Sequence, residues 1–392
     1  MADRMHDSQP SATPVKVERL DAFVLRAPAD PPVQTSFGIM RDRPAVLVRL
    51  TDSDGCEGWG EVWCNFPTVG AEHRARLLLA YGRPIVTGQA WASPRRAWET
   101  LVARLAVLML QTGEPGPLHQ IAAGIDMAMW DLFARRAGQP VWRALGGAGA
   151  WPVPVYASGI NPTDPAELAL AKRAEGYRAF KLKVGFGAER DLGNLRDMRE
   201  ALGGDAVLMV DANQAWDAED AVAAGHRMAP FDLLWLEEPV RADAPPQTWA
   251  KLAAEQPLRL AGGENLCGHA QYRDFIGEPG MSVIQPDAGK WGGLTGCLDV
   301  AQQAIAAGKW YCPHWLGAGI GLLASLHLKT AAGGAGYVEV DANPNPLRDA
   351  MAAPVMHLSD GCVQLGDAPG FGVVPDLGAL APYLVELQQT GL

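Results

Sequence analysis

Polar residues recur at a nearly constant interval along the second half of this chain, each at or just after the end of a short apolar run. The interval is 23 to 28 residues, about the length of one strand and one helix. The residues in this series are Lys183, Asp211, Glu237, Glu264, Asp287, His314 and Glu339. Ala-rich helical segments separate the runs, a pattern typical of parallel βα units. The series predicts a β/α barrel with its functional groups at the carboxyl ends of the strands.

The part of the chain before the series has a different pattern. With 392 residues, 48% of them hydrophobic, the chain is too long for one average domain. Strand-like runs at 15–20 and 45–50 and a hairpin signal at Asp54-Gly55 precede helical spacing through 71–137. We expect a flexible tail at 1–14, an α+β domain at 15–147 with a C-terminal return at 352–392, and the barrel at 148–351.

Composition excludes several classes of partner. The net charge is −11, and Lys and Arg are scattered, so we expect no nucleic-acid binding. No run of eighteen apolar residues exists, so no membrane span is predicted, and Met1–Pro14 lacks the apolar core of a signal peptide. The six cysteines form no C-x-x-C pair, which is typical of free thiols in a reducing cytoplasm.

Asp211, Glu237 and Glu264 end three successive predicted strands, so their carboxylates should converge at the barrel rim. Three such carboxylates cannot all stay ionised without a cation. Oxygen ligands without Cys or His favour Mg²⁺, and Mn²⁺ is a plausible substitute. The alternative, that each acid only caps the following helix, explains a single residue better than three at barrel spacing.

Lys181 and Lys183 are two residues apart on one predicted strand, so both side chains leave the same face. A lysine beside a second cation and a metal loses proton affinity, which makes it a usable base. His314 follows Asp287 by one unit of the series, and a carboxylate bonded to an imidazole favours acid or base catalysis. The alternatives are two solvated lysines on an edge strand and a histidine satisfied within the core.

Two glycine-rich segments are weaker signals. Gly185-Phe186-Gly187 follows a strand, but Arg190 stands where a dinucleotide-binding fingerprint needs a third glycine. The run Gly317–Gly321 either cradles an anionic group or is only a permissive turn, and we favour the turn.

The motifs around the series resemble those of one known family, the mandelate racemase subgroup of the enolase superfamily. The matching segments are Lys181-Leu182-Lys183, Val210–Trp216, Glu237-Glu238-Pro239, Gly262–Asn265, Gln285-Pro286-Asp287 with Gly292-Gly293, Pro313-His314, and, in the first domain, Ile125–Leu132 and Gln139–Gly147. The resemblance implies an α/β fold, a (β/α)7β TIM-like barrel with an N-terminal α+β capping domain. Asp287 stands where the muconate-cycloisomerising branch would carry a lysine base.

The resemblance also implies residue roles. Lys183 would remove a proton and Lys181 would lie near the substrate carboxylate. His314, with Asp287, would act on the opposite face. Glu339 resembles the family's protonated acid that donates to the substrate carboxylate. Asn213, two residues after Asp211 on the same face, is a candidate hydrogen-bonding group for the substrate or the metal shell.

Together these residues predict Mg²⁺-dependent abstraction of the proton alpha to a carboxylate, through a metal-stabilised enediolate. Sugar acids offer both an acidic α-proton and a β-hydroxyl, so we favour an acid-sugar dehydratase. A racemase or epimerase and a lactone cycloisomerase use the same bases and stay open. An alternative of another class is a catalytically silent barrel that binds a metal and an acid. We expect a small carboxylate as partner, and the resemblance suggests a homo-oligomer.

Substrate choice should depend on the first domain, through loops expected at Ser36–Arg43 and Cys64–Val69 that fold over the barrel mouth. Arg41, Arg43 and Asn65 are candidates to recognise a distal carboxylate or hydroxyl groups. The alternative is that the arginines are ordinary solvated surface.

Overall fold

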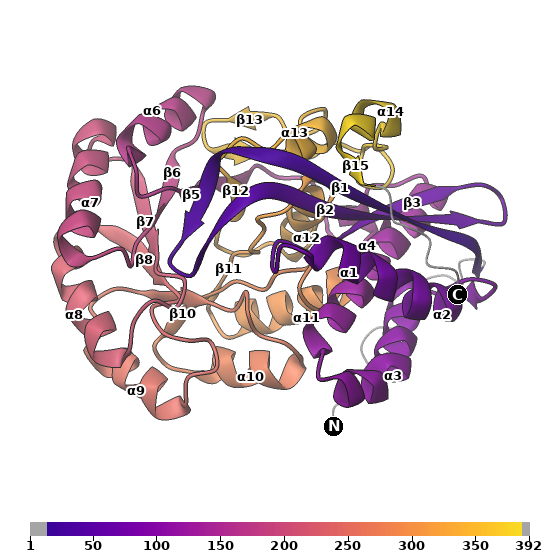
Figure 1. The fold of residues 1–392 in the computed structure, drawn as a ribbon, viewed down its shortest axis with the longest axis horizontal. Coiled ribbons are helices and arrows are strands. Elements are labelled where there is room, and N and C mark those ends of the chain that lie inside the picture. Colours follow the sequence, from indigo (N-terminus) through magenta and orange to yellow (C-terminus); the bar gives the residue numbers. More distant parts are fainter. Residues whose placement is uncertain (1–13, 386–392) are drawn as a thin grey trace.

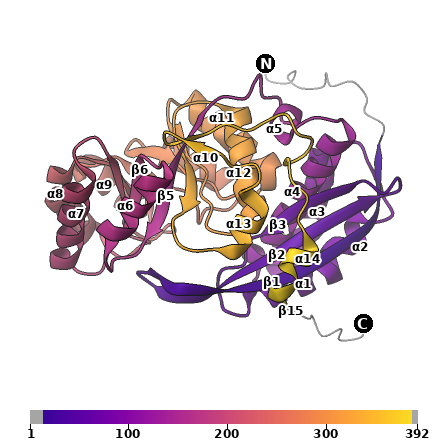
Figure 2. The same ribbon diagram turned by 90° about the horizontal axis from the view of Figure 1, so that it is seen from above.

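The computed structural model describes residues 14–385, so the tail expected at 1–14 lies outside the described residues except for Pro14. An antiparallel sheet with packed helices and a β/α barrel lie side by side (Figures 1 and 2). In the described part of the chain, no helix is long and apolar enough to cross a membrane.

The first domain is a sheet in the order β15-β1-β2-β3, with β4 paired to β1. Its strands are β1 (Val15–Thr35), β2 (Gly38–Asp52), β3 (Glu57–Val62), β4 (Ala90–Trp91) and β15 (Leu384–Val385). Its helices are α1 (Gly70–Leu77), the π-helical turn Leu78–Gly82, α2 (Arg83–Val86), α3 (Pro94–Thr112), α4 (Pro115–Arg136) and α5 (Val141–Ala144). The hairpin signal at Asp54-Gly55 is confirmed, because β2 and β3 pair on either side of it.

Strands β1 and β2 are much longer than the sequence runs predicted. Thr35 pairs with Gly38, so only Ser36 and Phe37 form the turn, and the loop expected at 36–43 is mostly β2. The hairpin extends from the sheet across the barrel mouth (Figure 1). At its tip, the Ser36 hydroxyl donates to the Asn213 carbonyl at 2.9 Å. The backbone pairing of β1 with β2 therefore continues beyond the residues whose hydrophobic alternation predicts a strand.

The second part alternates strands and helices. Its strands are β5 (Val153–Ile160), β6 (Ala179–Lys183), β7 (Val207–Asp211), β8 (Leu233–Glu237), β9 (Leu260–Gly262), β10 (Met281–Ile284), β11 (Trp310–Tyr311) and β12 (Val338–Asp341). Its helices are α6 (Pro165–Glu175), α7 (Ala188–Leu202), α8 (Ala218–Met228), α9 (Pro246–Glu255), α10 (His269–Gly277), α11 (Gly293–Ala306) and α12 (Gly319–Ala332), with a 3₁₀ turn at Ala229–Phe231.

These eight strands are parallel and follow the order β12-β5-β6-β7-β8-β9-β10-β11. Backbone bonds from Tyr311 N to Ala335 O at 3.2 Å and from Glu339 N to Pro313 O at 3.4 Å connect the last two segments and close the ring. Eight strands with seven intervening helices confirm the (β/α)7β barrel. We propose the domain boundary near residue 148, between α5 and β5.

The C-terminal segment contacts both parts. After α13 (Pro346–Ala352), strands β13 (Leu358–Ser359) and β14 (Cys362–Val363) form a hairpin, and β14 pairs antiparallel with β5 of the barrel. Then α14 (Leu377–Leu380) and a 3₁₀ turn at Ala381–Tyr383 lead to β15, which pairs with β1. The segment therefore returns to the first sheet only after it has extended the barrel sheet by two short strands.

Alternation along the strands decides what fills the barrel. On β6, Phe180 and Leu182 pack in the main core, whereas Lys181 and Lys183 alternate with them and are buried. A separate apolar cluster fills the barrel interior below the lysines and consists of Tyr156, Ala179, Met209, Trp235, Ala261, Val283 and Cys312. Charged groups can therefore gather only at the carboxyl ends of the strands.

Strand β3 lies unusually close to helix α4 because glycine removes the side chains between them. A Cβ on Gly60 would lie 2.1 Å from the Gly124 carbonyl oxygen, and one on Gly58 would lie 2.3 Å from the Ala128 carbonyl oxygen. This contact sets the position of the acidic residues that β3 and α4 carry.

We predict that Gly60→Ala lowers the melting temperature, because overpacking against backbone costs on the order of 1–3 kcal/mol. The matched control is Gly193→Ala in α7, where an added Cβ meets nothing within 4 Å. It should stabilise the helix by about 0.5–1 kcal/mol. Scanning calorimetry of the two variants checks both signs, and a Gly60→Ala protein as stable as the wild type would contradict the contact.

Candidate active site

The strand register brings the predicted residues to one end of the barrel. Lys183 pairs with Asp211 between β6 and β7, and Asp211 pairs with Glu237 between β7 and β8. Glu237 pairs with Ala261, so Glu264 follows β9 just past the same level. Asp287 and His314 follow β10 and β11. Six residues far apart in the sequence thus share one rim because parallel strands end together.

Each of the three predicted metal ligands contacts a cation of the protein itself. Lys183 Nζ donates to Asp211 at 2.5 Å, and Lys181 Nζ donates to Glu237 at 2.6 Å. A further lysine, absent from the sequence prediction, donates to Glu264: Lys290 Nζ lies 3.0 Å from Glu264 Oε1. In residues 14–385, no three His, Cys, Asp or Glu side chains are set around one point as a metal cage. Binding of a cation would therefore displace these lysine contacts.

The donor chemistry nevertheless fits a hard divalent cation. Burial, partly offset by Lys181, raises the pKa of Glu237, and together with the charge of Asp211 it brings that pKa to about 7. The neighbouring Glu238, which the sequence reasoning passed over within its own motif, is also buried, and its pKa is raised to about 8 by burial and then by Glu264. The side-chain oxygen of Asn213 is buried beside Asp211 without a hydrogen-bond partner. Crowded carboxylates and an orphan amide oxygen are what an oxygen-ligated Mg²⁺ would satisfy.

The sequence predicted a lowered proton affinity for the two lysines, and in the structure their proton affinity is raised. Burial lowers the pKa of Lys183 and Lys181 lowers it too, but Asp211 and the other carboxylates raise it, and the net direction is upward. Burial also lowers the pKa of Lys181, and Glu237 and Glu339 outweigh that effect. In this arrangement both lysines hold their protons because carboxylates outnumber them.

Asp287 and His314 lie in direct contact. His314 Nδ1 is 2.6 Å from Asp287 Oδ2, and His314 Nε2 is 2.6 Å from Glu264 Oε2. The other oxygen of Asp287 accepts from the backbone N–H groups of Gly289 and Lys290 at 2.7 and 3.0 Å, which fixes the carboxylate. Burial lowers the pKa of His314, but Glu264, Glu339 and Asp287 raise it well above its usual value. The imidazole is therefore held as a proton donor with a fixed orientation.

Glu339 lies between Lys181 and His314. Its Oε1 is 2.9 Å from Lys181 Nζ, its Oε2 is 3.4 Å from His314 Nε2, and Ser158 and the Trp315 N–H also donate to it. Burial raises the pKa of Glu339, but Lys181 and His314 hold it at about 2. Glu339 thus accepts hydrogen bonds here, and its expected role as a protonated donor stays a prediction.

The first domain carries the three residues predicted to recognise the substrate, and the structure places them in different environments. Asn65 is buried and donates to the Leu316 carbonyl at 2.7 Å, two residues after His314. Arg43 is buried in an ion pair with Asp341 at 2.5 Å. Arg41 is exposed, and no hydrogen bond or ion pair of the described residues joins it to the cluster. The structure therefore does not bring Arg41 into the candidate site, because its position on β2 directs it to solvent.

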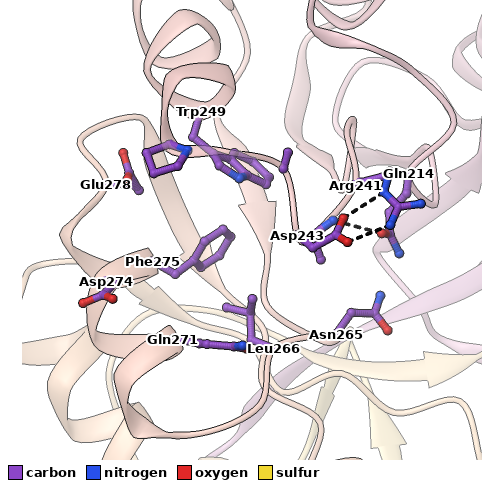
Figure 3. Close-up of a pocket in the computed structure, with 13 residues that line it drawn as sticks. Gln214, Arg241, Asp243, Trp249, Asn265, Leu266, Gln271, Asp274, Phe275 and Glu278 are labelled. Atoms are coloured by element: carbon purple, nitrogen blue, oxygen red, sulfur yellow. Dashed lines mark hydrogen bonds and ion pairs between the residues drawn. The ribbon is translucent and has the colours of Figure 1, made fainter. Parts of the chain in front are cut away.

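A cavity of about 560 Å³ lies outside the rim, between the loops that precede α9 and α10 (Figure 3). Trp249, Phe275 and Leu266 line its apolar part, and Arg241 pairs with Asp243 at its edge. It includes Asn265 but none of the predicted acids and bases. We therefore locate the chemistry at the barrel mouth and not in this cavity.

Comparison with known families gives two matches that together cover most of the chain. Residues 164–379 match the family described as enolase C-terminal domain-like. Residues 19–146 match the mandelate racemase / muconate lactonizing enzyme N-terminal domain.

Three relatives are similar over nearly the whole chain. A 3,6-anhydro-alpha-L-galactonate cycloisomerase of Streptomyces coelicolor is 34% identical, over 93% of this chain and 99% of its own length. A D-galactarolactone cycloisomerase of Agrobacterium fabrum is 30% identical, over 94% and 99%. An L-talarate/galactarate dehydratase of Salmonella typhimurium is 30% identical, over 93% and 85%.

Solved structures share the fold. A mandelate racemase/muconate lactonizing enzyme from Bordetella bronchiseptica is 52% identical with a TM-score of 0.89, and the match covers 94% of this chain and 99% of the other. A racemase from Streptomyces coelicolor with bound magnesium is 31% identical with a TM-score of 0.85, over 94% and 100%. An enolase from Bradyrhizobium with magnesium and mandelic acid is 29% identical with a TM-score of 0.83, over 95% and 99%.

We predict that Asp211→Asn and Glu264→Gln each weaken Mg²⁺ binding by at least about tenfold, because each removes a charged oxygen ligand. Isothermal titration calorimetry of the purified variants measures the affinity. The control is Glu219→Gln on the exposed face of α8, which should bind as the wild type does. Equal affinity in all the variants would contradict the assignment of these carboxylates.

Proposed function

Because the chain belongs to the mandelate racemase subgroup of the enolase superfamily, we propose that its reaction is the Mg²⁺-dependent dehydration of a sugar-derived acid, begun by removal of the α-proton. One observation carries the proposal. Lys183 on β6 and His314 after β11 lie on strands separated by four strands with carboxylates at their ends, β7 to β10, on one side and by β12 and β5 on the other. A substrate held at the rim would meet one group from each direction.

The residues would divide the proton transfers between them. Lys183 Nζ, as the neutral amine, would take the proton from the α-carbon. The electron pair would pass first onto the substrate carboxylate, and in a second step it would form the double bond between the α- and β-carbons as the β-hydroxyl leaves. His314, protonated and held by Asp287, would give its proton to that hydroxyl, so that water is released. Lys181 Nζ would hold the substrate carboxylate.

The carboxylates Asp211, Glu237 and Glu264 would hold the metal, with Asn213 beside them. Bound Mg²⁺ supplies positive charge for the substrate carboxylate as negative charge develops there. Mn²⁺ is a plausible substitute, because it takes the same oxygen ligands. A cation on Asp211 would also remove the contact that raises the pKa of Lys183.

The names of the relatives support the substrate class. All three are named for sugar acids or their lactones. Two of them are cycloisomerases, which makes lactone cycloisomerisation the second candidate, and a racemase or epimerase would use the same two groups. Because these relatives are enzymes, a catalytically silent barrel is the weaker alternative.

Three further proposals concern the whole protein. The cysteines are free thiols, which supports a cytoplasmic location. The family resemblance supports a homo-oligomer, and the partner we propose is a small-molecule carboxylate.

We predict that the wild type with Mg²⁺ exchanges the α-proton of at least one sugar acid in D₂O, and that NMR of the product shows loss of water. Lys183→Ala and His314→Ala should each lower overall turnover by at least about 100-fold, because each removes one proton-transfer group. His226→Ala on the exposed side of α8 is the control and should be fully active.

If NMR of the product shows closure or opening of a lactone ring and no loss of water, the reaction is a cycloisomerisation and not a dehydration. If no acid in a panel of aldonic, aldaric and α-hydroxy acids exchanges its proton, the proposed function fails.

A further inference from the structure

Two buried carboxylates of the first domain have no role in the proposed chemistry and yet bond to the barrel. Glu61 lies on β3 and Asp126 on α4, and each is about 1% exposed. Burial raises the pKa of both to about 7, so their retention in the interior requires compensating donors. The donors are backbone N–H groups at the N-termini of barrel helices.

Glu61 caps α12. Its Oε1 accepts from the Ala318 N–H at 2.6 Å and its Oε2 accepts from the Gly321 N–H at 2.9 Å. The residue at the N-cap position, Ala318, has no side chain that could cap the helix itself. In the glycine run 317–321, the Ala318 and Gly321 amides therefore do not face a substrate anion, because a carboxylate of the first domain already takes them.

Asp126 caps α11 in the same way. Its Oδ2 accepts from the Thr295 N–H at 2.9 Å, and its Oδ1 accepts from the Thr295 hydroxyl at 2.6 Å. The N-cap residue is Gly292, again without a capping side chain. A Cβ on Gly293 would lie 2.3 Å from Asp126 Oδ2, so glycine at this position is what admits the carboxylate.

Other helices of this chain are capped from within. Ser93, Asp217 and Asn345 each accept from the backbone of the helix that they precede, at α3, α8 and α13. Capping from the other domain is therefore not general in this chain. It occurs at α11 and α12, the two helices that directly follow Asp287 and His314.

The two loops between these strands and helices also pack on each other, through the Trp315 ring. Within its own loop, the Trp315 indole Nε1 donates to the Ala318 carbonyl at 2.8 Å. A Cβ on Gly289, two residues after Asp287, would lie 2.5 Å from the Trp315 ring. Asp287 is close enough to Glu61 to raise its pKa. A shift at either helix start would therefore be transmitted to the Asp287–His314 contact.

We propose that Glu61 and Asp126 are positioning residues, through which the first domain holds the loops of Asp287 and His314 in register for proton transfer. This inference rests on the proposed function for its kinetic consequence. The geometric consequence, that the contact between His314 and Asp287 depends on the two caps, stands without it.

The test uses Glu61→Ala and Asp126→Ala in the full chain with Mg²⁺. With the substrate that the panel identifies, α-proton exchange in D₂O reports on Lys183, and product formation requires His314 as well. We expect product formation to fall about 100-fold in each variant, since a displacement of about 1 Å costs that much, while exchange persists. The ratio of exchange to product should therefore rise.

Asp131→Asn is the matched control. Asp131 is as deeply buried on the same helix and accepts from the Trp59 and Phe371 N–H groups, but it bonds to neither α11 nor α12. Loss of stability alone should lower exchange and product together in all three variants. An unchanged ratio in Glu61→Ala and Asp126→Ala overturns the proposal, as does the same rise in the control.

Crystal structures of the same variants separate this inference from the proposed function. A distance between His314 Nδ1 and Asp287 Oδ2 that stays near the present 2.6 Å in both variants overturns the inference. A lengthened distance, with faster amide hydrogen exchange at the start of α12 in Glu61→Ala and of α11 in Asp126→Ala, supports it even if no acid is turned over. A wild type without proton exchange would then count against the function alone.

Discussion

Charge compensation at the carboxyl ends of the barrel strands is the interaction on which the candidate site depends. Lys181 is fully buried, and a lone ammonium there would cost several kcal/mol. It is tolerated because Glu237 and Glu339 lie within 2.9 Å of its Nζ. The carboxylates in turn are tolerated because lysines and His314 face them. Each group is therefore stable only in the presence of the others.

This mutual dependence would allow the proposed site to bind a cation and to move protons. A metal that takes Asp211, Glu237 and Glu264 would release the lysines from the carboxylates that raise their pKa. The carboxylates that pair with the lysines are thus the same groups that would bind the metal. An apolar layer around Trp235 and Tyr156 lies beneath the charged cluster, so the charged side chains are confined to the barrel mouth.

The first domain does more than cover this mouth. Its β1–β2 hairpin contacts the loop of Asn213, and its carboxylates Glu61 and Asp126 cap the two helices that follow the His314–Asp287 pair. Close packing of β3 on α4, made possible by Gly58 and Gly60, fixes the two elements that carry these acids relative to each other. Substrate contact and orientation of the acid can therefore be controlled from the same domain.

The sequence by itself determined the barrel, the carboxylate trio, the paired lysines and the His314–Asp287 pair. Strand period and the 23-to-28 residue interval are local properties that hold wherever parallel strands end together. It could not place β5, which ends at Ile160 without a polar residue of the series, or the full length of β1 and β2. Only the tertiary structure decided that Lys290 and Glu238 join the cluster, that Arg41 does not, and that Glu61 caps a helix 257 residues later. A single acid on a strand forms no repeating pattern along the sequence. Its partners here are backbone amides, which every residue except proline carries, so the sequence does not identify them.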